Sequence, residues 1–345
     1  MVKRLKVATA LAGAPVGGAE TFFTRFSCQL HKTNAVDVRV FTRDNAIRQP
    51  EFDKANANVE HFRFGGKLDL IDHWAYRRAL KKFAPDIVLT FMNRATQLTP
   101  KGDYQLVGRL GHYYDLKYYR HCDYCIGITR GICDHLIQGG IPASRVVYIP
   151  NFVDETVAEA ATKSSLGIKD QEPMILALGR LHVNKAFDVL IPAFAKLDAG
   201  VLCIAGDGPE KDALQAQAKS LGIEDRVKFL GWRTDINNLL RASDLFVCSS
   251  RSEGLGSIVL EAWFNRCPMA AVASQGPGEL IRHGDTGLLS PIDDVDELSE
   301  NMRVILADQS LAQSLSVNGY NEYLQNYSRD KIIGDYLDFF NTIAV

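Results

Sequence analysis

Glu253-Gly254-Leu255-Gly256-Ser257-Ile258-Val259-Leu260-Glu261 is the stretch of sequence on which the predicted fold depends. The apolar run at 244–250 before it predicts a buried parallel strand, and the apolar residues at 258–264 predict a helix that is buried on nearly every side. A strand, a turn with glycines and a helix N-terminus present backbone N–H groups and a positive dipole end to a crevice. This arrangement favours a bound phosphate.

The two carboxylates of this stretch, Glu253 and Glu261, are expected to lie roughly 12 Å apart if each residue between them adds the 1.5 Å rise of a helix. The catalytic carboxyl groups of a retaining glycosidase lie only about 5 Å apart, and the inverting enzymes also have a shorter separation than this. The spacing instead suits the two ends of one extended ligand with a pyrophosphate between them.

Two cations follow another predicted strand. The strand at 173–178 leads into Gly179 and Arg180, and Lys185 comes five positions later. A planar guanidinium that forms paired hydrogen bonds, together with a compact ammonium charge, is the combination that diphosphate oxygens need. The alternative is that both are ordinary surface charges.

The order of these motifs resembles the retaining nucleotide-sugar glycosyltransferases of family 4, which have two Rossmann-like domains in the GT-B architecture. The resemblance covers most of the chain and is best over residues 174–290, where Gly276 and Glu279 follow the Glu253-x7-Glu261 pattern. Strands alternate with helices along the whole sequence, which predicts parallel sheets with helices on both faces. The expected fold class is therefore α/β, with two Rossmann-like domains whose parallel sheets face a central cleft.

The resemblance implies a role for each matching residue. Arg180 and Lys185 hold the donor diphosphate and stabilise it as the leaving group, Glu253 binds hydroxyls of the donor sugar, and Glu261 binds the ribose hydroxyls. The remaining donor contacts in the second half are expected from loops at strand ends and from backbone N–H groups, at Gly206, Gly208, Trp232, Gly254, Leu255, Gly256, Ser257 and Ile258.

The first half supplies three further candidate residues. A strand at 5–11 leads through Gly17 and Gly18 into a helix at 19–31, but the glycine spacing does not match the dinucleotide-binding pattern G-x-G-x-x-G. By resemblance, these glycines face the donor and the acceptor across the cleft; the alternative is a turn that simply needs small residues. His112 follows a predicted strand end, where α/β proteins place functional groups, and resembles a family histidine near the transferred sugar. An incidental histidine is the alternative.

Two positions depart from the family pattern. Phe152 replaces the glycine of a linker usually written P-N-G-V-D, and Ala186 stands where glycine is usual. The domain boundary is placed at this linker. Residues 1–152, with a returning helix at 330–345, form the predicted acceptor domain, and residues 153–329 form the nucleotide-sugar domain.

The helix predicted at 68–83 allows two interpretations. Leu68, Ile71, Trp74, Ala75, Ala79 and Leu80 can share one side of it, and a helix that connects two strands is expected to pack that side on its sheet. Alternatively, a helix that combines tryptophan with basic residues lies on a membrane surface.

Charge and cysteine content bear on location and partners. Residues 1–150 carry 22 Lys and Arg against 13 Asp and Glu, which suits an anionic acceptor or the inner leaflet of a membrane. The alternative is a chance asymmetry of charge between solvated faces. Seven cysteines, an odd number, predict reduced thiols in a cytoplasmic protein; a zinc site around His121, Cys122 and Cys125 is the alternative. No basic and aromatic pattern for nucleic-acid binding is present.

The sequence therefore predicts a retaining glycosyltransferase that moves a sugar from a nucleoside diphosphate sugar, with UDP as the expected nucleotide, to a glycan or glycolipid of the cell surface. The catalytic set is His112, Arg180, Lys185 and Glu253. No cofactor and no metal are expected, since no Asp-x-Asp motif directly follows one of the strands predicted from the sequence. The alternatives are a nucleotide-sugar epimerase of the same architecture and a non-catalytic two-lobed sugar-binding protein.

Overall fold

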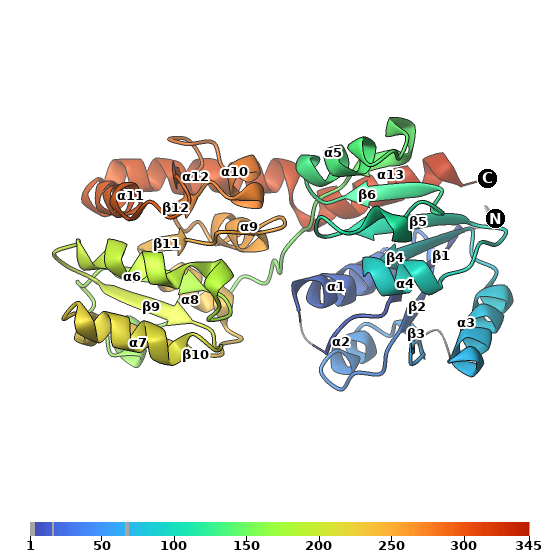
Figure 1. Cartoon of the computed structure of the whole chain (residues 1–345), viewed down its shortest axis with the longest axis horizontal. Coiled ribbons are helices and arrows are strands. Elements are labelled where there is room, and N and C mark those ends of the chain that lie inside the picture. Colours follow the sequence, from blue (N-terminus) through green and yellow to red (C-terminus); the bar gives the residue numbers. More distant parts are fainter. Residues whose placement is uncertain (1–3, 16, 66–68, 345) are drawn as a thin grey trace. The chain divides into compact units, whose positions relative to one another are not determined.

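The computed structural model describes residues 4–15, 17–65 and 69–344 of the chain. It divides the chain into two compact units, Met1–Phe152 with Arg329–Val345, and Val153–Ser328. The sequence predicts breaks at 152/153 and 329/330, and the structure has them at 152/153 and 328/329. Each unit is an α/β fold around a parallel sheet, so the predicted fold class is confirmed (Figure 1).

The described part of the first unit contains a sheet of seven strands in the order β3-β2-β1-β4-β5-β6-β7, all parallel. The order reverses between β1 and β4, because the chain first adds strands on one side of β1 and then on the other. The strands span Lys6–Leu11 (β1), Asp37–Thr42 (β2), Asn58–His61 (β3), Ile87–Phe91 (β4), Gln105–Leu110 (β5), Tyr124–Gly127 (β6) and Val146–Tyr148 (β7).

The helices of the first unit connect these strands, and the last helix of the chain returns to pack against them (Figure 1). Phe23 and Phe26 of α1 and Tyr336 of α13 belong to one apolar core with the inward side chains of the sheet. The helices are α1 (Gly18–Lys32), α2 (Gln49–Lys54), α3 (Leu70–Phe83), α4 (Met92–Leu98), the short η1 (Leu116–Tyr118) and η2 (Ala143–Arg145), α5 (Arg130–Gln138) and α13 (Arg329–Ile343).

A buried arginine ties this returning helix to the sheet. Arg109 on β5 is 2 % exposed, its Nε donates to the hydroxyl of Tyr336 on α13 at 2.9 Å, and its Nη2 donates to Asn151. Its guanidinium also lies 4.3 Å from the ring centre of Phe22 and 5.0 Å from that of Phe91. Burial raises the pKa of Tyr336, so this hydroxyl stays neutral and holds the cation as a dipole.

We expect Tyr336→Phe to lower the free energy of unfolding by about 1.5 kcal/mol, because a buried guanidinium loses one of its acceptors. Urea unfolding measures this directly. Tyr320→Phe is the matched control. The half-buried ring of Tyr320 also lies beside a guanidinium, with its centre 4.0 Å from that of Arg266, but its hydroxyl forms no hydrogen bond with any residue that the structure describes. Equal stability of the two variants would contradict the anchoring role of Arg109.

In the second unit, a sheet of six parallel strands has the order β10-β9-β8-β11-β12-β13. Here the order reverses between β8 and β11. The strands span Met174–Leu178 (β8), Val201–Ala205 (β9), Val227–Gly231 (β10), Leu245–Cys248 (β11), Met269–Val272 (β12) and Leu288–Ser290 (β13). The helices are η3 (Lys163–Leu166), η4 (Val183–Lys185), α6 (Phe187–Ala195), α7 (Lys211–Ser220), η5 (Glu224–Arg226), α8 (Ile236–Ala242), α9 (Ser257–Phe264), α10 (Gln275–Leu280), α11 (Val295–Ala307) and α12 (Gln309–Asn326).

The departures from the family pattern have different structural consequences. Phe152 is 1 % exposed and packs edge-on against Phe22 at 5.3 Å, so the larger side chain is absorbed by the core of the first unit. Ala186 adopts the left-handed region with φ of 51°, which glycine occupies without steric cost. The glycine usual at that position is therefore explained by the backbone that α6 needs at its start.

The buried side of α3 agrees with the predicted one only in part. Leu80 is buried as predicted, and Tyr76 and Phe83 also face the core. Ile71 and Trp74 are instead 78 % and 61 % exposed, Ala75 and Ala79 are partly exposed, and Leu68 lies outside the described residues. The ring of Tyr76 packs edge-on against the rings of Phe41, Phe62 and Phe64, with 5.1–5.6 Å between ring centres. No helix within the described ranges, α3 included, is long and apolar enough to span a bilayer.

Candidate active site

The second unit brings two predicted site residues together at the point where its strand order reverses. Lys185 ends η4 in the connection that follows β8, and Glu253 lies in the connection that follows β11. Their side chains form an ion pair between Nζ and Oε1 and are 24 % and 17 % exposed. In open α/β sheets, this reversal point beyond the carboxyl ends of the strands is where ligands bind.

The Glu253 carboxylate and backbone are held by three neighbouring residues that the sequence analysis did not assign. Ser250 Oγ donates to Glu253 Oε1 at 2.9 Å, and the N–H of Gly276 donates to the Glu253 carbonyl at 3.2 Å. The Glu253 N–H donates to Gln275 Oε1 at 3.4 Å. The loop after β11 is thus fixed by the first turn of α10, which presents Glu253 toward Lys185.

Arg180 and Lys185 follow β8 as predicted, but only Lys185 is engaged. Gly179 has φ of 147°, and a Cβ there would lie 2.9 Å from Lys185 Cε, so the missing side chain makes room for the lysine stem. The exposed Arg180 side chain has no hydrogen bond or ion pair with any residue that the structure describes. Two cations therefore follow the same strand, and within the described part of the chain only the lysine is paired.

Gly206 and Gly208 are required by contacts within the protein itself. Gly206 has φ of 150°, and a Cβ at this position would overlap the carbonyl oxygen of Gly179. A Cβ at Gly208 would overlap the backbone of Leu181. The loop after β9 therefore packs tightly against the loop that carries Arg180, and the predicted donor contact of these glycines stays a prediction.

The glycine-bearing turn before α9 is not helical from Glu253 onward. α9 begins at Ser257, with Gly256 before it at φ of 72°, so the estimate of 12 Å between the two carboxylates rests on a helical rise that residues 253–256 do not have. A Cβ at Gly276 would overlap the Leu255 carbonyl, which brings the first turn of α10 against the turn before α9.

The other predicted donor residues occupy different surroundings. Leu255 is 3 % exposed, so only its backbone is available to a ligand; Gly254, Ser257 and Ile258 are partly exposed around the start of α9. Glu261 is half-buried on the second turn of the same helix. Trp232 is 70 % exposed just after β10, the outermost strand on its side of the sheet.

In the first unit, the predicted glycines lie in a loop that is organised by a buried carboxylate. Glu20 is 5 % exposed, and its Oε1 accepts the N–H of Ala14 at 2.8 Å. A Cβ at Gly13 or Gly17 would overlap this carboxyl group, whereas one at Gly18 would meet nothing within 4 Å. The need for glycine at position 17 thus comes from Glu20, and the space beside Gly18 is open.

His112 is exposed in the loop that follows β5, as predicted from its place after a strand. Its Nδ1 accepts the N–H of Tyr113 at 2.9 Å. A neutral imidazole with Nδ1 as an acceptor carries its proton on Nε2. The ring therefore offers an N–H donor to a ligand oxygen at this edge of the sheet.

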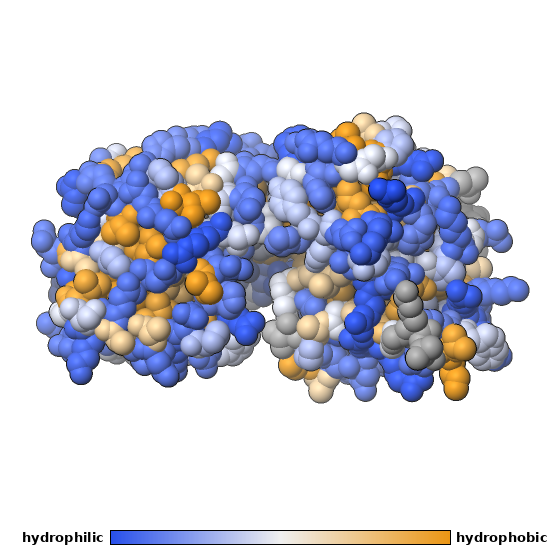
Figure 2. Space-filling model, viewed as in Figure 1, coloured by the Kyte–Doolittle hydropathy of each residue, from blue (hydrophilic) through white to orange (hydrophobic). Residues whose placement is uncertain are grey.

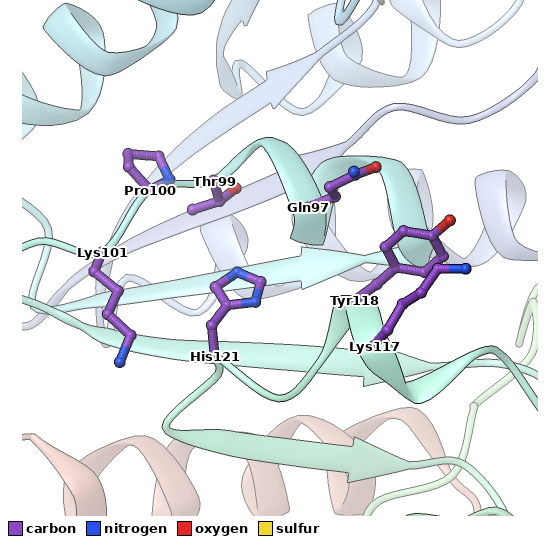
Figure 3. Close-up of a pocket in the computed structure, with 7 residues that line it drawn as sticks. All are labelled: Gln97, Thr99, Pro100, Lys101, Lys117, Tyr118 and His121. Atoms are coloured by element: carbon purple, nitrogen blue, oxygen red, sulfur yellow. The ribbon is translucent and has the colours of Figure 1, made fainter. Parts of the chain in front are cut away.

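A pocket of about 730 Å³ in the first unit contains none of the predicted site residues (Figure 3). Figure 3 shows Lys101 and Lys117 extending to opposite ends of it, with His121 between them. Lys117 is paired with Asp115 at 2.5 Å, and His121 Nε2 bonds the Thr96 carbonyl at 3.1 Å. The described residues contain no group of three or more potential metal ligands, which removes the support for a zinc site at His121.

Comparisons with known proteins identify the family. The family model "Glycosyl transferases group 1" matches residues 159–322, and the model "Glycosyltransferase Family 4" matches residues 16–157. The lipopolysaccharide core biosynthesis glycosyltransferase LpsE of Rhizobium meliloti is 30 % identical over 324 residues, which cover 93 % of this chain and 95 % of LpsE. This chain belongs to the family 4 glycosyltransferases.

A second relative and a solved structure are also similar to this glycosyltransferase over nearly its whole length. LpsD of Rhizobium meliloti, also described as a lipopolysaccharide core biosynthesis glycosyltransferase, is 28 % identical over 328 residues, with 94 % of this chain and 95 % of LpsD covered. The crystal structure of Anabaena Alr3699/HepE in complex with UDP and glucose superposes with a TM-score of 0.84 at 21 % identity and covers 99 % of this chain and all of HepE. The predicted GT-B architecture is confirmed by this likeness.

Arg251 joins the two loops of the candidate site, and no motif in the sequence pointed to it. Its guanidinium pairs with Asp188 at 2.7 Å and with Asp293 at 2.6 Å. It also contacts η4, donating from Nη1 to the Val183 carbonyl at 2.7 Å and from its own N–H to the Asn184 carbonyl at 2.8 Å. The arginine two positions before Glu253 therefore fixes the segment that ends at Lys185. Its place beside the strand end was the available signal.

We expect Arg251→Met to lower kcat/KM about tenfold without a comparable loss of stability, because a displaced η4 no longer presents its lysine in the required position. Arg282→Met is the control, since Arg282 also pairs with two carboxylates, those of Asp285 and Glu322, but away from η4. Steady-state kinetics measure kcat/KM of both variants, and thermal unfolding gives their Tm. An equal effect of both substitutions on kcat/KM would show that Arg251 has no positioning role.

Proposed function

We propose that this glycosyltransferase moves a sugar from a nucleoside diphosphate sugar to a glycan or glycolipid acceptor of the cell surface, with retention of configuration at the anomeric carbon. The observation that carries the proposal is the contact between Lys185 and Glu253 at the reversal point of the second sheet. A glycosidic phosphate bond joins the sugar to the diphosphate in such a donor. A cation for the phosphate and a carboxylate for the sugar hydroxyls must therefore lie side by side, as these two residues do.

The remaining residues supply the other contacts of the donor. Arg180 is exposed and close to Lys185 in the same connection, where it can pair with a second phosphate oxygen. The backbone N–H groups at the start of α9 add donors to the developing negative charge. In this proposal Glu261 accepts hydrogen bonds from the two ribose hydroxyls, and His112 donates its Nε2 proton to an oxygen of the substrate.

The proposed reaction consumes no reactant other than the donor and the acceptor. The bond between the anomeric carbon and the diphosphate oxygen breaks, and its electron pair stays on the diphosphate. The acceptor hydroxyl oxygen forms the new bond on the same face of the sugar, and its proton passes to the diphosphate. Arg180 and Lys185 stabilise the charge of the leaving group throughout.

UDP is the proposed nucleotide, and lipopolysaccharide or a related cell-surface glycan is the proposed acceptor class. HepE was crystallised with UDP and glucose, and LpsE and LpsD are described by their role in lipopolysaccharide core biosynthesis. We place the enzyme at the cytoplasmic face of the inner membrane, because a glycolipid acceptor is assembled on a membrane.

The test is a screen of UDP-, GDP- and ADP-linked sugars with the purified protein, with sugar release and transfer followed by mass spectrometry. We expect a UDP-sugar to be consumed and the product to keep the anomeric configuration of the donor, as read by NMR. An inverted product would overturn retention, and failure of all three nucleotide classes to bind would overturn the proposed donor.

We also propose that the reaction is independent of metal, because Arg180 and Lys185 can supply the positive charge with which a metal would otherwise neutralise the diphosphate. Addition of EDTA is expected to leave kcat unchanged. A loss of activity that added Mg²⁺ or Mn²⁺ restores would contradict this.

A further inference from the structure

The outward side of α3 combines exposed apolar side chains with a block of positive charge. Leu70, Ile71 and Trp74 are 71 %, 78 % and 61 % exposed. The second half of the same helix adds four exposed cations, Arg77, Arg78, Lys81 and Lys82. At 3.6 residues per turn, these seven side chains occupy one continuous arc of about 140° around the helix axis. We call these seven residues the α3 outer surface.

Among the described residues, it is the other side of α3 that packs on the core. Tyr76 is 1 % exposed, and its hydroxyl bonds Thr99 Oγ1 at 2.9 Å. The helix's one acidic residue, Asp72, is buried and accepts the N–H groups of Arg63 and Phe64 at 2.8 Å each. The α3 outer surface therefore carries four positive charges and no negative one.

Apolar side chains are visible over α3 among polar atoms in the space-filling view (Figure 2). The guanidinium of Arg78 lies 5.3 Å from the ring centre of Trp74, so a cation and an aromatic ring stand side by side on the surface. Isolated exposed apolar residues are common on soluble proteins. Three within two turns of one helix, beside four cations, indicate a binding surface.

We propose that the α3 outer surface binds an anionic lipid bilayer. Tryptophan, leucine and isoleucine enter the boundary between headgroups and acyl chains, while lysine and arginine pair with anionic headgroups. Protein interfaces, by contrast, are depleted in lysine. Charge complementarity with an anionic leaflet thus favours a lipid surface over a protein partner.

Hydrogen bonds connect the start of α3 to the loop that holds the predicted glycines of the first unit. Asp72 holds the backbone of Arg63 and Phe64, and Arg43 donates to the carbonyls of both, at 2.8 Å each. Arg43 Nη1 also reaches the Gly13 carbonyl at 3.4 Å. The apolar end of the α3 outer surface is thus linked to the loop between β1 and α1. If the proposed function holds, a lipid-anchored acceptor reaches the enzyme while it is docked.

The experiment is flotation of the full chain with vesicles of phosphatidylethanolamine and phosphatidylglycerol, compared with phosphatidylcholine alone. We expect binding to the anionic vesicles, weakened by salt. The variants Ile71→Ser/Trp74→Ser and Lys81→Gln/Lys82→Gln should each bind these vesicles at least roughly tenfold more weakly than the wild type. The first variant loses two apolar side chains that enter the bilayer, and the second loses two cations that pair with headgroups. Absence of binding by the wild type, or equal binding to neutral vesicles, overturns the proposal.

Matched controls separate this surface from exposure and charge in general. Val157→Ser/Leu324→Ser removes two apolar side chains that are 75 % and 46 % exposed in the second unit, and Lys169→Gln/Lys219→Gln removes two exposed lysines there. Both control variants should float as the wild type does. A loss equal to that of the α3 variants would contradict a specific surface. Binding of UDP, followed by thermal shift, should be the same in all variants, so a failure of lipid binding is distinguishable from a failure of the proposed donor.

Discussion

Replacing Lys185 by alanine is expected to lower kcat about a thousandfold with a much smaller change in KM. The ammonium pairs with Glu253 in the structure, and in the proposed reaction it stabilises the charge that the diphosphate develops as it leaves. A positioned donor that acts on such charge contributes about 10²–10³ in rate. An interaction that is stronger in the transition state than in the bound substrate affects kcat rather than KM. Steady-state kinetics with saturating donor measure this.

The control for Lys185→Ala is Lys196→Ala, because Lys196 also forms an ion pair on the second unit, with Asp296, but both of those side chains are largely exposed. Lys196→Ala should leave kcat unchanged. Lys185→Arg should recover part of the rate, since it keeps the positive charge with a different geometry. A kcat of Lys185→Ala within threefold of the wild type would remove the lysine from the mechanism.

Replacing Glu261 by alanine is expected to weaken UDP binding about a hundredfold. A carboxylate that accepts two ribose hydroxyls forms two charge-assisted hydrogen bonds, and the loss of such a pair raises Kd by about this factor. The ribose does not react, so these bonds are equally strong in the ground state and in the transition state. The change should therefore lie mainly in Kd and KM, with kcat at saturating donor affected little. Calorimetric titration of UDP gives the value.

Glu300→Ala serves as the control for Glu261→Ala. Glu300 also lies on a helix of the second unit, but its carboxylate is half exposed and pairs with Arg303 within the same helix. Its removal should leave the Kd for UDP unchanged. An unaltered Kd in the Glu261→Ala variant would show that this carboxylate does not hold the ribose.

Patterns of short range were sufficient for the elements near the site. The apolar runs predict β8, β11 and α9 to within about two residues, because a buried strand and a buried helix each need continuous apolar sequence. The prediction for α3 had the right element and placed Leu80 correctly in the core, but most of the predicted buried side was wrong. Ile71 and Trp74 are apolar but exposed, while Tyr76 is drawn inward by Phe41, Phe62 and Phe64, which lie on other segments.

The sequence by itself determined the class of fold and the alternation of strands and helices along the chain. It also determined the family and the positions after strand ends at which functional groups are expected. These follow from periodicity and local spacing, which act over a few residues. The pairing of Lys185 with Glu253, the support of that pair by Arg251 and Gln275, and the direction of the α3 outer surface were decided only by the tertiary structure. They depend on strand order and on packing between segments up to about 70 positions apart, and no local pattern specifies which loops meet.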